Sequence, residues 1–178
     1  MNIPTSTPHH ESQICFSLGN SSLGVVLVAC SPRGVCAIAL GDDTESVSLA
    51  FLHKFPSGQL VNDHPLLSGY LDQTIAFIES PKLGLDLPLD MRGTPFQQQV
   101  WQALLSIPLG TTCSYNSLAQ RIDAPNAIRA VAAACAANPI ALAIPCHRVI
   151  TSNGSMSGYR WGVERKTELL RREGALNL

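Results

Sequence analysis

The chain has 178 residues, of which 46% are apolar and 14% are charged, and its formal net charge is −1. This composition is typical of a folded protein with one large domain or two small ones. No apolar run approaches the roughly 20 residues of a membrane span, so we expect no membrane partner. Residues 1–13 are polar and lack the basic and apolar regions of a secretory signal, which predicts a flexible tail.

Cysteine usage indicates a reducing compartment. No two cysteines have C-x-x-C spacing and no histidine cluster accompanies them, so we expect no metal site. Most lie in apolar strings, which predicts free thiols in a reducing compartment, the cytosol or the nucleus. The predicted location is the cytoplasm, with association to the nucleoid when the protein is bound to DNA. The six are Cys15, Cys30, Cys36, Cys113, Cys135 and Cys146.

Charge is unevenly distributed along the chain. Residues 1–90 contain three Lys or Arg and nine Asp or Glu, a net charge of −6, whereas residues 91–178 contain nine and four, a net charge of +5. A basic half is what binding to a phosphate backbone requires. Ordinary scatter of surface charge explains the asymmetry equally well.

The first half has the pattern of an α/β domain. Runs rich in Val, Ile and Leu at residues 14–18, 24–30 and 34–40 are separated by turn residues and predict an antiparallel meander. Asp42-Asp43 opens one predicted helix and Asp63-His64-Pro65 a second, which ends before Ser80-Pro81. Alternation over residues 85–89 predicts one more strand. We expect this domain to span residues 14–90.

After residue 91 the pattern predicts helices only. Thr94, Pro95 and Gln97 form a capped helix start. A short helix capped by Ser114 and a second over residues 127–138 are about four residues apart, which predicts a helix-turn-helix. The second is rich in alanine, so it either approaches another surface closely or packs tightly in a core. A last helix is expected over residues 163–173, within a second domain at 91–178.

Residues 144–150 place Cys146 and His147 side by side between apolar residues, directly after Pro145. A thiol beside an imidazole is the raw material for a thiolate nucleophile. Adjacent side chains on an extended segment point to opposite faces, so we expect no direct contact between the two. From this pair alone, a buried structural cysteine is the simpler interpretation.

Further motifs change that interpretation. Phe96-Gln97-Gln98-Gln99-Val100-Trp101, Ser114-Tyr115, Arg129-Ala130-Val131, Asn138-Pro139, Pro145-Cys146-His147-Arg148-Val149 and Gly158-Tyr159 occur in this order. Together they closely resemble the O6-alkylguanine-DNA alkyltransferases, the methylated-DNA–protein-cysteine methyltransferases. The likeness is strongest over residues 92–174 and is nearest to the carboxy-terminal domain of the bacterial Ada type.

The resemblance implies an α+β fold: an amino-terminal ribonuclease H-like α/β domain with a short antiparallel sheet, then a helical, winged-helix-like domain with a helix-turn-helix. It implies DNA repair by direct reversal, in which a nucleotide is flipped from double-stranded DNA and its alkyl group moves to Cys146. The substrate would be O6-alkylguanine, with O4-alkylthymine as a further candidate, bound through the minor groove. The transfer would be irreversible, so a monomer would act once, with no cofactor and no metal.

The resemblance also implies a role for each matching residue. Cys146 is the expected acceptor, His147 the base that acts through a water, Glu173 the carboxylate that orients this histidine, and Asn138 the brace of the active-site turn. Tyr115 is expected to serve the 3′ phosphate and the guanine ring, and Tyr159 to form a wall of the base pocket. Arg129 would enter the base stack and Ala130 would meet the groove floor. The carbonyls of Cys146 and Val149 would bind the exocyclic amine, and the amide of Arg160 would meet O6.

Three other classes of protein compete with this interpretation. Relatives that only bind alkylated DNA lack the cysteine of the motif. Cysteine hydrolases usually bring their histidine from a distant segment, and helix-turn-helix regulators usually have a more basic recognition helix and form dimers. Ada-type members carry an upstream zinc domain and a regulatory helix-turn-helix. Neither occurs in this sequence, so we expect either a stand-alone protein or a piece of a longer one, and the sequence does not support an activator role.

Overall fold

The computed structural model describes residues 13–62, 64–156 and 158–176. The predicted meander is confirmed as β1 (Cys15–Ser21), β2 (Gly24–Ser31) and β3 (Gly34–Gly41), paired antiparallel. A short strand that the sequence pattern did not predict, β4 (Gln59–Leu60), pairs with β1 in parallel. The resulting sheet has the order β3-β2-β1-β4.

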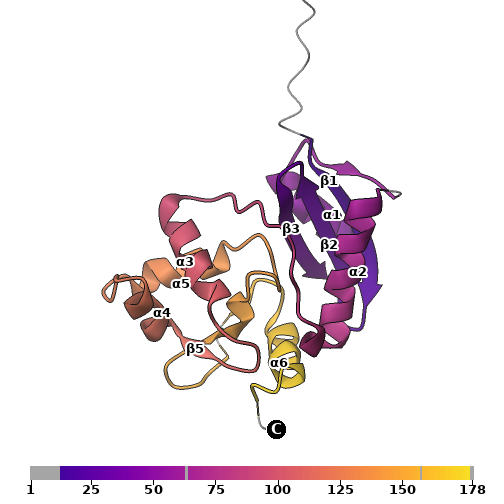
Figure 1. The fold of residues 1–178 in the computed structure, drawn as a ribbon. Coiled ribbons are helices and arrows are strands. Elements are labelled where there is room, and N and C mark those ends of the chain that lie inside the picture. Colours follow the sequence, from indigo (N-terminus) through magenta and orange to yellow (C-terminus); the bar gives the residue numbers. More distant parts are fainter. Residues whose placement is uncertain (1–12, 63, 157, 177–178) are drawn as a thin grey trace, which may run out of the picture.

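Two helices cover opposite faces of this sheet (Figure 1). Helix α1 (Thr44–Lys54) begins where predicted, because the Asp43 side chain accepts a hydrogen bond from the Ser46 amide at 2.7 Å. Helix α2 (Pro65–Glu79) is capped by His64, whose Nδ1 accepts from Leu67 N at 3.4 Å. Asp63, which we expected at this helix start, lies outside the described residues, as do residues 1–12 of the predicted tail.

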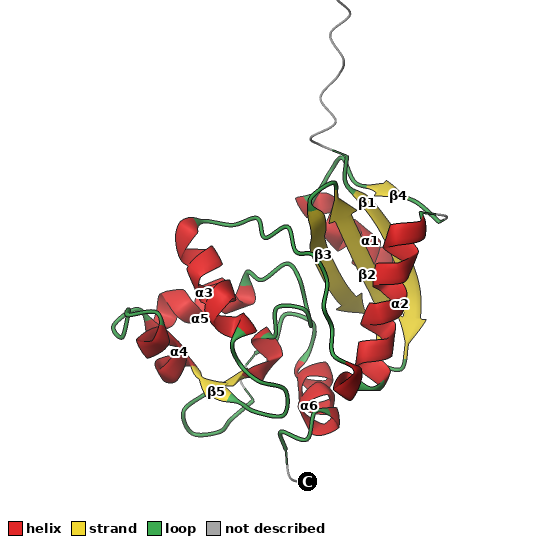
Figure 2. Cartoon of the chain, in the orientation of Figure 1, coloured by secondary structure: helices red, strands yellow, loops and turns green. Residues whose placement is uncertain are grey.

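The second half contains four α-helices among the described residues (Figure 2). Helix α3 (Pro95–Leu105) has the predicted capping box, in which Thr94 and Gln97 exchange two hydrogen bonds. Helices α4 (Tyr115–Arg121) and α5 (Ile128–Ala136) confirm the predicted helical pair. Helix α6 (Val163–Arg172) ends the fold and places Leu169 and Leu170 in the core.

Two predictions of local structure are wrong. Residues 85–89 form no strand: η2 (Pro81–Leu83) precedes them, and only Leu89 makes an isolated bridge to Val35. Pro88 has no amide hydrogen to donate, so this segment cannot extend a ladder. The second half is also not purely helical, because β5 (Cys113–Ser114) pairs in parallel with β6 (Val149–Ile150). Strands of two residues are too short to produce a periodic pattern.

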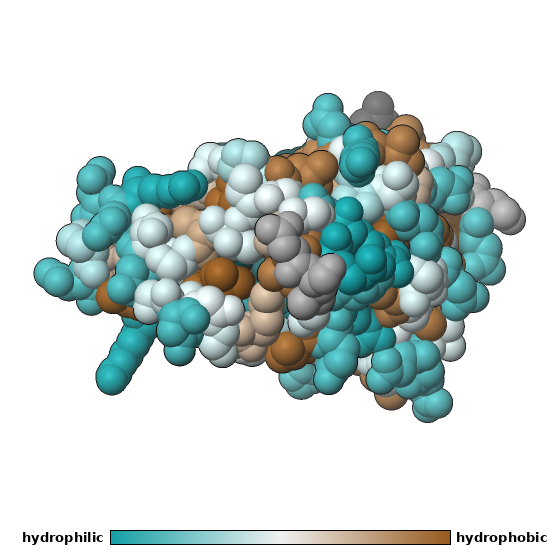
Figure 3. Space-filling view, turned by 90° about the horizontal axis from the view of Figure 1, so that it is seen from below, coloured by the Kyte–Doolittle hydropathy of each residue, from teal (hydrophilic) through white to brown (hydrophobic). Residues whose placement is uncertain are grey.

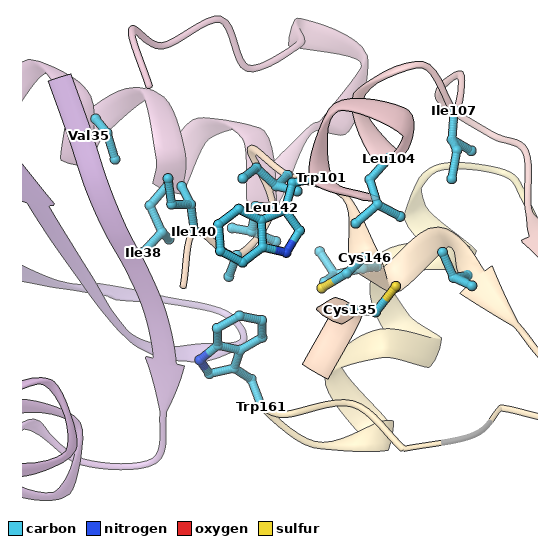
Figure 4. Packing of buried hydrophobic residues seen from close by; sticks show 14 of the residues in the cluster. Val35, Ile38, Trp101, Leu104, Ile107, Cys135, Ile140, Leu142, Cys146 and Trp161 are labelled. Carbon is cyan, nitrogen blue, oxygen red and sulfur yellow. The ribbon is translucent and has the colours of Figure 1, made fainter. Parts of the chain in front are cut away.

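The two halves share a continuous hydrophobic core. One cluster of buried residues joins Val35 and Ile38 of β3 to Trp101, Leu104 and Ile140 of the second half (Figure 4). At this seam the Ile38 amide donates to Pro139 O and its carbonyl accepts from Ala141 N, both at 3.0 Å. The chain segment that follows α5 is therefore fixed against the sheet.

None of the described helices is long and apolar enough to cross a membrane. On the face of the molecule seen in Figure 3, apolar side chains are scattered among hydrophilic ones. Such scattering is ordinary for a protein surface.

Candidate active site

Cys146 begins η3 (Cys146–Arg148), at the end of a turn-rich segment that follows α5. The fully buried Asn138 holds this segment: its Nδ2 donates to Ile144 O at 2.9 Å and lies 3.2 Å from Cys146 Sγ. Its Oδ1 accepts from Ile140 N at 2.9 Å. Leu142 adopts a φ of 69°, a left-handed conformation that costs a side-chain-bearing residue roughly 1 kcal/mol or more. The Asn138 contacts stabilise this turn and fix the thiol.

His147 and Glu173 form a completely buried pair. His147 Nε2 lies 2.8 Å from Glu173 Oε1, and both side chains are fully shielded from solvent. Glu173 is the residue that caps the carboxyl end of α6. Gly110 lies so close to this turn that a Cβ added there would be 2.9 Å from Glu173 O, so glycine permits the approach.

Arg148 completes the buried arrangement around Glu173. Its Nε donates to Oε2 at 2.9 Å and its Nη2 to Oε1 at 3.0 Å, while Nη1 donates to Ile107 O at 2.7 Å. A bidentate pair of this kind holds a carboxylate in one orientation. The negative charge of Glu173 is therefore compensated by Arg148 before any proton reaches His147.

The environment shifts the pKa of each group. Burial raises the pKa of the Cys146 thiol to about 11, although the Asn138 amide and the Lys166 charge act in the opposite direction. Burial lowers the pKa of His147, opposed by the hydrogen bond to Glu173. Burial alone would raise the pKa of Glu173, but the hydrogen bonds from His147 and Arg148 lower it to about 2.

These shifts define the resting state at neutral pH as a neutral thiol, a neutral imidazole and an ionised carboxylate. Because the Glu173 carboxylate only accepts hydrogen bonds, His147 carries its proton on Nε2. Nδ1 is then the basic nitrogen, and this buried atom has no hydrogen-bond partner among the described residues. His147 is thus able to accept a proton at Nδ1 while Glu173 stabilises the resulting imidazolium.

Cys146 lines a cavity of about 360 Å³ between α5 and the segment around residue 159. Three other predicted site residues line it, namely Tyr115, Tyr159 and Arg160. The rings of Tyr159 and His147 meet edge to face at 6.5 Å between centroids. The remaining lining residues are small or thiol-bearing: Ala132, Cys135, Ala136, Thr151 and Gly158.

Arg129 and Ala130 lie outside this cavity, on the exposed side of α5. The buried side of the helix consists of Val131, Ala134 and Cys135, and the Trp101 indole donates to Ala134 O at 2.9 Å. Ile128 and Arg129 are exposed at the start of α5, and every exposed position that follows them in the helix is alanine. One helix therefore presents a smooth face to solvent and, at its end, a wall of the cavity.

Two buried cations, Arg148 and Lys166, were not among the predicted site residues. Lys166 is 1% exposed, and its Nζ donates to Val149 O at 2.6 Å. A carbonyl oxygen has two lone pairs, so Val149 O retains one acceptor position. Position 166 lies three and four residues before Leu169 and Leu170, and a charge on the apolar stripe of a helix is the signal that identifies it.

The described residues include no group of three or more His, Cys, Asp or Glu placed to hold a metal ion. The described side chains of the site are a buried thiol that lines a cavity and, beginning at the next residue, a buried imidazole–carboxylate pair. A thiol next to a histidine–carboxylate pair is the set of groups found in proteins that use a cysteine nucleophile.

Comparison with known proteins identifies the family. Residues 95–175 match the family model of the 6-O-methylguanine DNA methyltransferase DNA binding domain. The chain is 50% identical over 158 residues to the bifunctional transcriptional activator/DNA repair enzyme Ada of Escherichia coli, covering 89% of this chain and 45% of that one. It is 40% identical over 143 residues to a methylated-DNA–protein-cysteine methyltransferase of Mycolicibacterium paratuberculosis, covering 79% and 86%.

Solved structures agree with these matches. The crystal structure of Mycobacterium tuberculosis OGT in complex with DNA has a TM-score of 0.77 and 35% identity, with coverage of 90% of this chain and 93% of that one. The chain therefore belongs to the 6-O-methylguanine DNA methyltransferase family, as the sequence motifs predicted. It spans slightly less than half the length of the Ada proteins that it matches.

Proposed function

We propose that this protein repairs DNA by moving the alkyl group of O6-alkylguanine onto Cys146, as a methylated-DNA–protein-cysteine methyltransferase. The observation that carries the proposal is the position of the Cys146 thiol. It lines a cavity, and the next residue, His147, forms a buried pair with Glu173. Family membership supplies the substrate class, and the names of relatives include methylated-DNA–protein-cysteine methyltransferase.

The proposed reaction follows from the resting protonation states. A flipped nucleotide places its O6-alkyl carbon at Cys146 Sγ, and the thiol proton passes through a water to His147 Nδ1. The thiolate attacks the alkyl carbon, the S–C bond forms and the C–O bond breaks. The leaving guanine takes a proton on its ring, for which the Tyr115 hydroxyl is the proposed donor. The thioether has no good leaving group, so the protein acts once.

The high pKa of Cys146 fits this one-use chemistry. A thiol that ionises only when His147 accepts its proton is protected from random alkylation in the absence of substrate. The imidazolium that forms faces an ionised Glu173, whose pKa of about 2 keeps it charged throughout. The proposed base pocket has Tyr159 as a wall, the Val149 carbonyl as acceptor for the exocyclic amine, and the Arg160 amide as donor to O6.

Helix α5 is the proposed contact with the minor groove of double-stranded DNA. Its exposed alanine positions permit close approach to a groove floor, and Ala130 would lie against it. Arg129 at the start of the helix would fill the gap that the flipped base leaves in the stack. A positive net charge in residues 91–178 supports attraction to the phosphate backbone.

We also propose a finer description of the two domains, the oligomeric state and the cellular location. We assign residues 14–90 to a ribonuclease H-like domain and residues 91–178 to a winged-helix-like domain. Two helices on opposite faces of the sheet, and the short β5–β6 pair beside α4 and α5, support these assignments. The protein would act as a monomer in the cytoplasm, and its six free cysteines fit a reducing compartment.

Mass spectrometry after mixing with duplex DNA that contains O6-methylguanine tests the proposal. We expect one methyl group on Cys146, in amounts that never exceed one per protein molecule. Cys146→Ser should abolish transfer while DNA binding remains, and Cys36→Ser, at a buried thiol of β3, is the matched control. An unchanged mass, or a methyl group on another cysteine, would overturn the assignment.

A further inference from the structure

A second thiol lines the cavity that contains the acceptor. Cys135 lies in the last turn of α5, and both it and Cys146 contribute to the cavity wall. Figure 4 places the two sulfurs in the same part of the core, below Leu104. Neither residue is in a disulfide, and each side chain is buried apart from the part that borders the cavity.

Asn138 contacts the backbone of one cysteine and the thiol of the other. Its backbone amide donates to Cys135 O at 3.2 Å, and its side-chain Nδ2 lies 3.2 Å from Cys146 Sγ. Asn138 thus contacts Cys135 through its backbone and Cys146 through its side chain. Burial lowers the pKa of the Lys166 ammonium, and the nearby Cys146 and Cys135 sulfurs both act in the opposite direction.

We propose that Cys135 is a resolving thiol for Cys146, so that oxidation of the acceptor by a hydroperoxide ends in a reversible Cys135–Cys146 disulfide. In the first step, the Cys146 thiolate attacks the peroxide oxygen, the O–O bond breaks, and Cys146 sulfenic acid and water (or an alcohol) form. In the second step, Cys135 sulfur attacks the sulfenic sulfur, and the hydroxyl leaves with the Cys135 proton as water. Two sulfurs are each oxidised by one electron and one peroxide is reduced.

A disulfide with Cys135 would protect Cys146 from irreversible oxidation. A sulfenic acid with no nearby thiol proceeds to sulfinic and sulfonic acids, which are not reversed by ordinary thiol reductants. An acceptor used only once would be lost in this way before meeting its substrate, a consequence that rests on the proposed function. With Cys135 as partner, a cellular dithiol can return Cys146 to the active thiol by exchange.

The burial of the pair limits how fast it oxidises. Burial raises the pKa of Cys135 to about 12, and that of Cys146 to about 11, so neither is a thiolate for much of the time. The cavity admits a small peroxide to Cys146, and His147 is the base that would take its proton. Oxidation is therefore expected to depend on His147 as alkyl transfer does.

Peptide mapping of the wild-type protein without reductant is the first test. After hydrogen peroxide treatment in the absence of DNA, we expect a cross-linked peptide that joins Cys135 to Cys146 and is lighter by two hydrogens. Dithiothreitol should remove the cross-link and restore alkyl transfer. Sulfinic or sulfonic acid on Cys146 with Cys135 still a free thiol would overturn the proposal, as would a cross-link to Cys113.

Variants separate this proposal from the repair function. In Cys135→Ala and Cys135→Ser we expect peroxide to produce sulfinic and sulfonic Cys146 that dithiothreitol does not reverse, each compared with its own unoxidised sample. Cys113→Ala, at a buried thiol in β5 that does not line the cavity, should behave as the wild type. Recovery that is equal with and without Cys135 would exclude a resolving role. The mass readout needs no alkylated DNA, so it stands even if the repair proposal fails.

Discussion

Arg148 and Glu173 are joined by two hydrogen bonds inside the protein, Nε to Oε2 at 2.9 Å and Nη2 to Oε1 at 3.0 Å. They come from different elements, η3 and the end of α6, and only the fold brings them together. Their pairing explains how a carboxylate can stay ionised beside a neutral histidine in a solvent-excluded site. It also links the stability of the protein to the groups that would activate Cys146.

Glu173→Gln should reduce both stability and transfer. It leaves the Arg148 charge buried without its counter-charge, which typically costs about 3–5 kcal/mol. It also removes the charge that stabilises protonated His147, so single-turnover transfer should fall roughly 100-fold or more. Urea unfolding and a quenched-flow transfer assay measure the two effects. Glu164→Gln, at an exposed position of α6, should change neither, and a normal rate in Glu173→Gln would contradict the relay.

The same carboxylate predicts an acid limit of stability. The pKa of Glu173 is about 2 in the folded protein against an ordinary 4.5, so between these values the unfolded chain binds the extra proton. Its contribution, about 3 kcal/mol, is therefore complete above pH 4.5 and lost as the pH falls toward 2. The lowered pKa of His147 acts in the same direction below pH 6.5. Urea unfolding as a function of pH should show a smaller acid slope in Glu173→Gln.

The raised pKa of Cys146 predicts that the folded protein loses stability at alkaline pH. Its pKa is raised from 9 to about 11 in the folded protein, so the folded state retains a proton that the unfolded chain releases. The corresponding stability is present below pH 9 and is lost as the pH rises toward 11. Cys146→Ala removes this titration, and the wild-type minus variant difference in unfolding free energy isolates it. A difference that does not change between pH 8 and 11 would contradict the raised pKa.

Asn138→Ala should loosen the turn that carries the acceptor. It leaves the Ile140 amide and the Ile144 carbonyl without their buried partner, at about 1–3 kcal/mol each. We expect a lower melting temperature together with slower transfer. Asn116→Ala, at an exposed position of α4, is the control. Asn138→Asp keeps the acceptor oxygen but places a negative charge beside Cys146 Sγ, so it should slow transfer even where stability is regained.

Arg129→Ala tests the proposed insertion into the base stack. Arg129 is exposed, so the free energy of unfolding should change by no more than about 0.5 kcal/mol. Transfer from duplex DNA should fall by roughly 10-fold or more, because flipping costs a few kcal/mol that the inserted side chain offsets. Transfer from the free base O6-methylguanine should be unaffected. Equal losses of transfer rate with duplex DNA and with the free base would place the defect in the base pocket instead. Arg121→Ala, which removes an exposed positive charge elsewhere, is the control for a general loss of charge.

Much of the local structure could be predicted because its causes are local. The meander follows from alternating apolar runs and turn residues, and α3 from the capping box of Thr94 and Gln97. The short β5–β6 pair could not be predicted, since its two strands are 36 residues apart in sequence and gain stability only from tertiary pairing. Residues 85–89 alternate as a strand does, yet they pack along β3 without forming a ladder.

The sequence by itself determined the segment of the proposed acceptor, its Cys-His pair and the family, because these depend on residue identity and order. The resemblance implied that Glu173 orients His147, but tertiary structure decided the buried environment on which the proposed chemistry depends. Glu173 is 26 residues from His147 and Arg148 is 25 residues from Glu173, and burial turns these three into one coupled group. It also placed Lys166 against Val149 and Cys135 beside the acceptor. Desolvation and charge pairing are properties of the packed interior: the apolar stripe of α6 indicates that Lys166 is buried, but no local pattern identifies the groups that Lys166 and Arg148 contact.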